Sequence, residues 1–175
     1  MTNVQSNYTH FPDINNKATI VTYTGKSFNY IFPKAEDICI EDIAMGLSNA
    51  RRFAGQLFNP MTVAQHSLQV CNLCPPELKL VGLLHDASEA YIGDCPKPLK
   101  RFLPQFQQIE NEIVEVIFEK YNLNIKDLVK IKLYDKQAFI YEKRNAGEVF
   151  IPVLTSEQAY NTFLITFIKL INANE

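Results

Sequence analysis

Residues 83–94 read Leu-Leu-His-Asp-Ala-Ser-Glu-Ala-Tyr-Ile-Gly-Asp, and this stretch continues an apolar segment that starts at Leu78. The pattern predicts a helix over residues 78–92, with Gly93 directly after it. His85 and Glu89 share one face of such a helix because they are four residues apart, and Asp86 lies about 100° from His85 around the axis. His85 and Asp86 can therefore both reach one metal ion wedged between helices, although they point in different directions.

Further helices are predicted on both sides of this segment. Their apolar residues recur at helical spacing, and Thr155 with Gln158 forms the pattern of a capping box before the last of them. Residues 18–23 and 28–32 instead alternate apolar and polar residues around a turn at Gly25. The sequence therefore predicts an all-α helical bundle with a small N-terminal β-hairpin over residues 18–32 and a helical core over residues 40–172. The other predicted helices cover residues 40–52, 63–73, 106–121, 125–144 and 156–172.

The chain has 175 residues, with 17 Lys and Arg against 19 Asp and Glu, and a net charge of −2. The length predicts a single domain over residues 1–175, and the weak negative charge disfavours binding to duplex nucleic acid. No targeting or membrane-spanning segment is visible, so we expect a cytoplasmic protein, in the host cytoplasm if it is viral, that binds no membrane. His10 lies in a polar terminal segment and is expected to be disordered or structural.

The chain contains four cysteines, and we expect all of them to be reduced thiols. Cys71 and Cys74 form a C-x-x-C pair, which could be half of a zinc site or a redox pair. No second C-x-x-C exists, and Pro75-Pro76 ends the segment. A structural role for this pair is therefore favoured over a zinc or redox role.

His66 and Asp135 supply further candidate metal ligands. Both lie in predicted helices, and a buried carboxylate at Asp135 would be costly without a cation. With His85 and Asp86 they would offer two imidazoles and two carboxylates, a set that suits Zn²⁺, Mn²⁺, Co²⁺, Fe²⁺ or Mg²⁺. Catalysis would require a metal that keeps open positions beyond these four ligands. Each of these residues taken alone is more often a satisfied core or surface residue than a ligand.

The order His66, His85-Asp86, Asp135 resembles the H…HD…D signature of the HD-domain phosphohydrolase superfamily, and in particular its compact 5′-deoxynucleotidase-like branch from phages and bacteria. The similarity covers roughly residues 23–144 and implies an HD-domain helical bundle that binds a divalent metal (Zn, Co, Mn or Mg). The further motifs that carry the resemblance are Thr22-Tyr23-Thr24-Gly25, Leu47-Ser48-Asn49-Ala50-Arg51-Arg52-Phe53, Thr62-Val63-Ala64-Gln65-His66-Ser67, Gly93-Asp94 and Pro96-Lys97-Pro98-Leu99-Lys100.

The resemblance also implies roles for individual residues. Glu89 matches the catalytic glutamate of the similar nucleotidases, and Asp94 would hold the attacking water or the leaving sugar oxygen. Arg51 stands at the offset of their phosphate-binding arginine. Solvated surface charges remain the alternative for Glu89 and for the cations, and a turn residue is the alternative for Asp94. The other candidate substrate-binding residues are Arg52, Lys97, Lys100, Asn49 and Phe53, with Arg101 next to them.

One departure from the monophosphate nucleotidases concerns the substrate. In those enzymes an aromatic residue directly follows the phosphate arginine, whereas here Arg52 intervenes between Arg51 and Phe53. The additional cation favours a longer phosphate chain, and Asn49 offers amide groups for a base edge. Within its branch the chain is similar to phage dATP triphosphohydrolases, which implies hydrolysis of dATP to deoxyadenosine and triphosphate, depleting dATP in an infected cell.

Two alternatives to a dATP triphosphohydrolase stay open. One is a 5′-deoxynucleotidase that releases phosphate from deoxynucleoside monophosphates. The other is a catalytically silent HD module that binds nucleotide or metal, which would lack ligands or Glu89. Members of this branch are often dimers or hexamers, so the resemblance implies a homo-oligomer with a small deoxynucleotide as its ligand.

Overall fold

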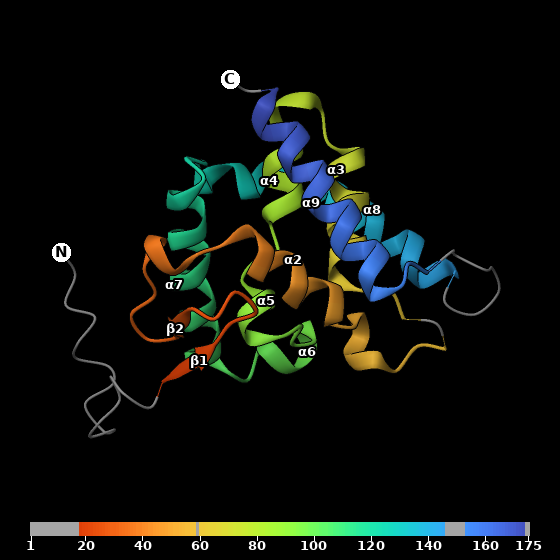
Figure 1. Ribbon diagram of the computed structural model, residues 1–175. Coiled ribbons are helices and arrows are strands. Elements are labelled where there is room, and N and C mark those ends of the chain that lie inside the picture. Colours follow the sequence, from red (N-terminus) through yellow and green to blue (C-terminus); the bar gives the residue numbers. More distant parts are fainter. Residues whose placement is uncertain (1–17, 59, 146–152, 174–175) are drawn as a thin grey trace.

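The computed structural model describes residues 18–58, 60–145 and 153–173, and it confirms the predicted all-α fold with a small N-terminal hairpin (Figure 1). Short 3-10 turns lie between some of the elements, at Ala35–Asp37, Arg52–Gly55, Pro76–Leu78 and Ile125–Asp127. In chain order the other elements are β1 (Thr19–Val21), β2 (Ser27–Asn29), α2 (Ile40–Asn49), α3 (Val63–Leu73), α4 (Lys79–Leu84), α5 (Glu89–Ile92), α6 (Lys97–Lys100), α7 (Pro104–Lys120), α8 (Leu128–Asn145) and α9 (Ser156–Asn172).

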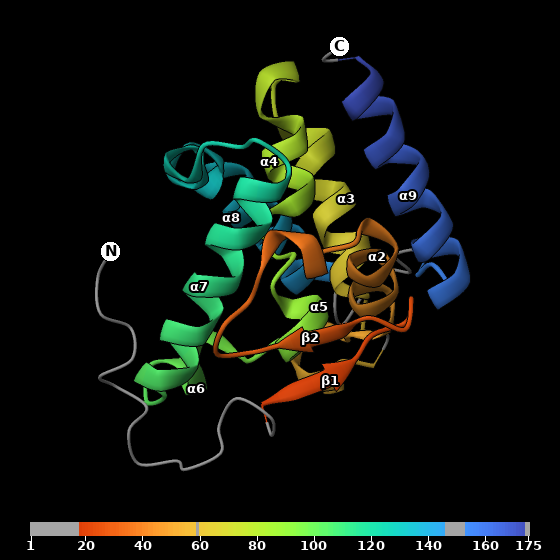
Figure 2. The ribbon, with the colours of Figure 1, turned by 60° about the vertical axis from the view of Figure 1, so that its left-hand side comes forward.

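Helix α3 lies in the centre of the bundle. It contacts α2, α4, α8 and α9, and Figures 1 and 2 show α7 and α9 on opposite sides of α3 and α4. The helix starts at Thr62, whose side chain accepts a hydrogen bond from the backbone N–H of Gln65 and so satisfies one of the free donors of the first turn. Because neighbours cover it on several sides, α3 buries polar as well as apolar side chains, among them His66 with 0% exposure.

The hairpin packs against the α2–α5 side of the bundle. Its strands pair antiparallel with Ile20 opposite Phe28, and they are shorter than the predicted 18–23 and 28–32. Phe28 is fully buried and stacks on Tyr91, with 4.0 Å between the ring centroids. At the turn, the buried Asp42 of α2 accepts hydrogen bonds from the Thr24 N–H (2.7 Å) and hydroxyl (2.9 Å). These contacts fix the hairpin on the core.

The helix predicted over residues 78–92 is broken, and this part of the prediction is wrong. Helix α4 ends at Leu84 and α5 begins at Glu89. Between them the backbone bonds from Ala87 N to Leu84 O and from Glu89 N to Asp86 O span three residues instead of four. The His85-Asp86 pair therefore lies in a tight turn between two helices.

The remaining helix predictions agree with the structure in type and differ at some ends. Residues 63–73 and 156–172 form helices with the predicted bounds, and the capping box at Thr155 and Gln158 is present. The first core helix ends at Asn49 instead of residue 52, because the chain turns at Arg52–Gly55. The helices predicted at 106–121 and 125–144 become α7 and α8, the latter preceded by a 3-10 turn.

The four cysteines are free, as predicted. Cys71 and Cys74 are buried between α3 and α4, where a Cβ on Gly82 would come within 2.9 Å of the Cys74 sulfur. Close packing is therefore the role that the structure shows for this pair. Across the described residues, no helix has the length and apolar character needed to cross a membrane.

Gly46 allows α2 to approach α5 closely. A Cβ placed on Gly46 would lie 2.4 Å from the carbonyl oxygen of Ala90, a backbone atom that cannot rotate away. We expect Gly46→Ala to lower the free energy of unfolding by about 1–3 kcal/mol, as overpacked core substitutions do. Helix propensity alone would favour alanine by about 1 kcal/mol, so the sign of the change separates packing from propensity.

Urea denaturation followed by circular dichroism measures this change. Asn161→Ala, on the exposed surface of α9, is the control and should change the free energy of unfolding by no more than about 0.5 kcal/mol. A Gly46→Ala variant as stable as the wild type would refute the close approach of α2 and α5.

Candidate metal centre

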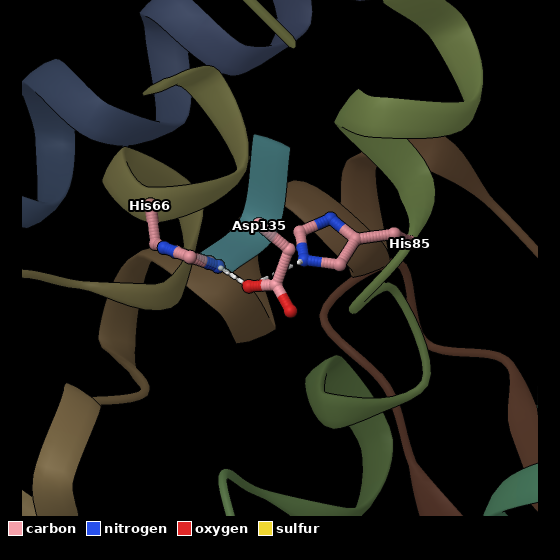
Figure 3. A group of neighbouring side chains, drawn as sticks. All are labelled: His66, His85 and Asp135. Carbon is pink, nitrogen blue, oxygen red and sulfur yellow. Dashed lines mark ion pairs between the residues drawn. The ribbon is translucent and has the colours of Figure 1, made fainter. Parts of the chain in front are cut away.

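His66, His85 and Asp135 converge from three separate parts of the chain. His66 lies on α3, His85 follows the last residue of α4, and Asp135 lies on α8. One ligand atom from each lies within 4.8 Å of the other two, so this group could hold a metal ion. Figure 3 shows the Asp135 carboxylate between the two imidazole rings. Its Oδ1 is 3.2 Å from His66 Nε2 and 4.0 Å from His85 Nε2.

Asp86 joins the same group. Its Oδ2 lies 3.2 Å from His85 Nε2 and 3.6 Å from His66 Nε2. The structure therefore brings all four predicted metal ligands together. The imidazoles form a buried wall with 0% and 6% side-chain exposure, whereas the carboxylates of Asp86 and Asp135 are 22% and 43% exposed. A small ligand could thus reach the cluster from the carboxylate side.

Both imidazoles are held by their Nδ1 atoms. His66 Nδ1 is hydrogen-bonded to the Glu142 carboxylate, and His85 Nδ1 donates to the Gly82 carbonyl over 2.8 Å. Metal-binding histidines are typically oriented in this way, because the bond at one nitrogen leaves the lone pair of the other free. The two Nε2 atoms are buried and have no well-aligned hydrogen-bond partner among the described residues. Two nitrogens in this state, next to two carboxylates, fit a divalent cation.

The charges around the cluster also favour a cation. Burial lowers the pKa of His66, but the adjacent carboxylates of Asp135 and Glu142 outweigh it and raise that pKa to about 9. Burial raises the pKa of Asp86, yet the neighbouring His85, His66 and Arg52 bring it below its ordinary value. The surplus of carboxylates that attracts a proton to His66 would equally attract a divalent ion.

Glu89 and Asp94 lie next to the cluster. Glu89 is 5% exposed, its Oε2 has no partner among the described residues, and its Oε1 is 3.9 Å from Lys100 Nζ. Burial and the nearby carboxylates of Asp86 and Asp94 raise the pKa of Glu89 well above its ordinary value. Burial, with a further contribution from Asp86, also raises the pKa of Asp94. Carboxyl groups with raised pKa values can exchange protons near neutral pH.

Arg52, and not Arg51, lies against the cluster. The Arg52 side chain is 13% exposed, with Nε 3.3 Å from Glu142 Oε2 and Nη1 3.8 Å from Asp86 Oδ2. The alternative of a solvated Arg52 is therefore wrong. Arg51 is exposed, and its guanidinium donates to the Pro60 carbonyl over 3.2 Å.

The turn Arg52–Gly55 sets this orientation. Phe53 and Ala54 both adopt left-handed backbone conformations, with φ of 56° and 52°, which only tertiary contacts can maintain in non-glycine residues. The Phe53 ring stacks on Phe139 of α8, with 5.7 Å between the ring centroids, and the Phe53 backbone lies close enough to Asp94 to offset part of the rise that burial causes in the pKa of that carboxyl. Phe53 thus lies between α8 and the segment that follows α5.

The other predicted substrate-binding residues differ in their exposure to solvent. Lys100 is 20% exposed and forms an ion pair with Glu110 at 2.6 Å, so its charge is partly satisfied before any substrate binds. Lys97 and Arg101 are exposed at the two ends of α6. Asn49 is exposed at the end of α2 and donates to the Met45 carbonyl. His10 lies outside the described residues.

Glu142 is a site residue that the sequence analysis missed. It is 3% exposed and binds both His66 and Arg52. Its spacing holds a signal that could have found it: Glu142 follows Asp135 by seven residues, which places both on one face of α8, two turns apart.

Comparison with known proteins gives relatives of uncharacterized function. The chain is 42% identical over 147 residues to the uncharacterized protein YfdR of Escherichia coli K12, covering 82% of this chain and 83% of YfdR. It is 31% identical over 110 residues to an uncharacterized protein of Rhodobacter capsulatus, covering 57% of this chain and 56% of that protein. No protein-family model matches the sequence.

Proposed function

The chain belongs to the same protein family as Escherichia coli YfdR, and we propose that this member is a metal-dependent phosphohydrolase of deoxynucleotides, of the HD-domain type. The observation that carries the proposal is the pair of buried imidazole Nε2 atoms that face two carboxylates without a well-aligned hydrogen bond, with the buried Glu89 beside them. The H…HD…D order of the ligands in the sequence supports the same assignment.

His66, His85, Asp86 and Asp135 would hold the metal. Two imidazoles and two carboxylates suit Mn²⁺, Co²⁺, Zn²⁺ or Mg²⁺ better than a soft metal. When bound, such an ion supplies Lewis-acid chemistry, polarising a phosphate oxygen and lowering the pKa of a water. Because two of the four ligands come from solvent-accessible carboxylates, substrate has a path to the metal side of the cluster.

Glu89 and Asp94 would act as the general base and general acid of the reaction. In the proposed reaction a water oxygen bonds to the α-phosphorus, the bond from that phosphorus to the sugar O5′ breaks, and O5′ receives a proton. Glu89 is placed to take a proton from the attacking water, because its Oε2 is buried without a partner and its raised pKa suits proton transfer. Asp94, whose pKa is also raised, would hold the water or donate to the leaving oxygen.

The cations determine how much phosphate charge the site can accept. An anionic substrate would be repelled by the carboxylates of the cluster without Arg52 and Lys100, which lie among them. The exposed Lys97, Arg101 and Arg51 could neutralise phosphates further out. Our first candidate reaction is therefore hydrolysis of dATP to deoxyadenosine and triphosphate.

A 5′-deoxynucleotidase is the second candidate, and one observation favours it. Arg52 already forms ion pairs with Asp86 and Glu142, and Lys100 with Glu110, so less positive charge is available for a long phosphate chain than the sequence indicates. A monophosphate carries less negative charge than a triphosphate, so it needs less positive charge from Arg52 and Lys100.

The product identifies the substrate class. We expect the protein, incubated with Mn²⁺, Co²⁺ or Mg²⁺ and each deoxynucleoside mono- or triphosphate in turn, to release deoxynucleoside. Ion-exchange chromatography then separates triphosphate, the product of the first candidate, from orthophosphate, the product of the second. No product with any metal and nucleotide would contradict the proposed function and leave a silent binding module.

Glu89→Gln tests the proton-transfer role. We expect it to bind metal like the wild type and to lose about 10²- to 10⁴-fold in turnover, since the amide cannot accept the proton. His85→Ala and Asp135→Ala are the comparison variants and should lose metal and turnover together. Metal content by mass spectrometry and rates of product release measure both properties. Full turnover by Glu89→Gln would refute the assignment of Glu89.

A further inference from the structure

We infer that Glu142 is a positioning residue, which orients His66 for the metal and Arg52 for the phosphate through the two oxygens of one carboxylate; this inference rests on the proposed function. Glu142 lies on α8, two turns after Asp135, and is 3% exposed. Its Oε1 is hydrogen-bonded to His66 Nδ1, and its Oε2 lies 3.3 Å from Arg52 Nε.

The contact to His66 determines which ring nitrogen faces the metal. The imidazole is fully buried, so water cannot compensate for a lost partner at Nδ1. A carboxylate only accepts hydrogen bonds, so a neutral His66 must carry its proton on Nδ1. The lone pair of Nε2 then points toward Asp135 and Asp86, where the candidate metal ligands meet.

The contact to Arg52 determines where its charge lies. With Nε held by Glu142, Nη1 reaches Asp86 at 3.8 Å, and the guanidinium stays beside the cluster. The left-handed Phe53 directly after Arg52 stacks on Phe139, three residues before Glu142 on α8. Helix α8 therefore holds the turn at Arg52 through Phe139 and Glu142, and it contacts His66 of α3 through Asp135 and Glu142.

Both oxygens of Glu142 are needed in this arrangement. His66 Nδ1–H and Arg52 Nε–H are both donors, and each uses a different carboxylate oxygen. A glutamine at this position offers one acceptor oxygen and one donating amide, so it can satisfy only one of the two. The Glu142→Gln variant keeps the size of the side chain and loses one of the two hydrogen bonds. It therefore distinguishes a residue that positions His66 and Arg52 from one that only packs against them.

Metal titration of the full chain without nucleotide tests this inference. We expect Glu142→Ala to weaken Mn²⁺ or Co²⁺ binding by about 10- to 100-fold, the usual loss for a residue that orients a metal-binding histidine. Glu142→Gln should weaken binding by less, and both variants should alter the visible absorption spectrum of bound Co²⁺, which reports ligand geometry. Isothermal calorimetry and Co²⁺ absorption measure the two effects.

Asp42→Ala is the matched control. Asp42 is also a buried carboxylate that accepts two hydrogen bonds, but its partner is Thr24 in the hairpin turn. Its loss should lower stability and leave metal affinity and the Co²⁺ spectrum unchanged. If Glu142→Ala fails to fold, the Glu142→Gln variant decides the result.

The possible outcomes separate the two proposals. Wild-type affinity and spectrum in the folded Glu142 variants would overturn the positioning role. Graded metal binding in these variants, with no nucleotide hydrolysed by the wild type, would refute the proposed function and support the role of Glu142. A wild-type protein that binds none of these metals would overturn both.

Discussion

The site depends on one buried imidazole. His66 lies in the middle of α3, the helix that contacts α2, α4, α8 and α9, and it is shielded completely from solvent. A polar ring in that position is costly unless both nitrogens find partners within the protein. Glu142 satisfies one nitrogen, and the other faces Asp86 and Asp135 without a well-aligned hydrogen bond. A divalent cation would satisfy this second nitrogen together with the carboxylates.

The fold brings the remaining groups to His66 by interrupting regular structure at two places. The break between α4 and α5 puts the His85-Asp86 pair in a tight turn, so that both side chains reach the same volume and Glu89 begins the next helix. The left-handed turn at Phe53 and Ala54 directs Arg52 inward. Backbone conformations of this kind cost free energy and persist only where the surrounding contacts maintain them. The stacking of Phe53 on Phe139 is one such contact.

The sequence was sufficient to predict the elements that local patterns encode. Helix 156–172 has an amphipathic period and a capping box, helix 63–73 follows the capping residue Thr62, and two of the four candidate ligands are histidines, of which the chain has three. The break at residues 85–88 was not predictable in this way, because residues 83–92 contain no glycine or proline. Arg51 and Arg52 could not be distinguished either, since their orientation depends on the tertiary contacts of Phe53. Glu142 could not be distinguished from a solvated charge, because it stands in the charged run Glu142-Lys143-Arg144.

The central claim is that one divalent ion unites His66, His85, Asp86 and Asp135. A crystal structure of the protein grown with Zn²⁺, with anomalous diffraction recorded at the zinc edge, tests it most directly. The account predicts a single strong anomalous peak about 2.0–2.2 Å from the Nε2 atoms of both histidines and from carboxylate oxygens of the two aspartates. Absence of a peak there, with the imidazoles hydrogen-bonded directly to the carboxylates, would contradict it.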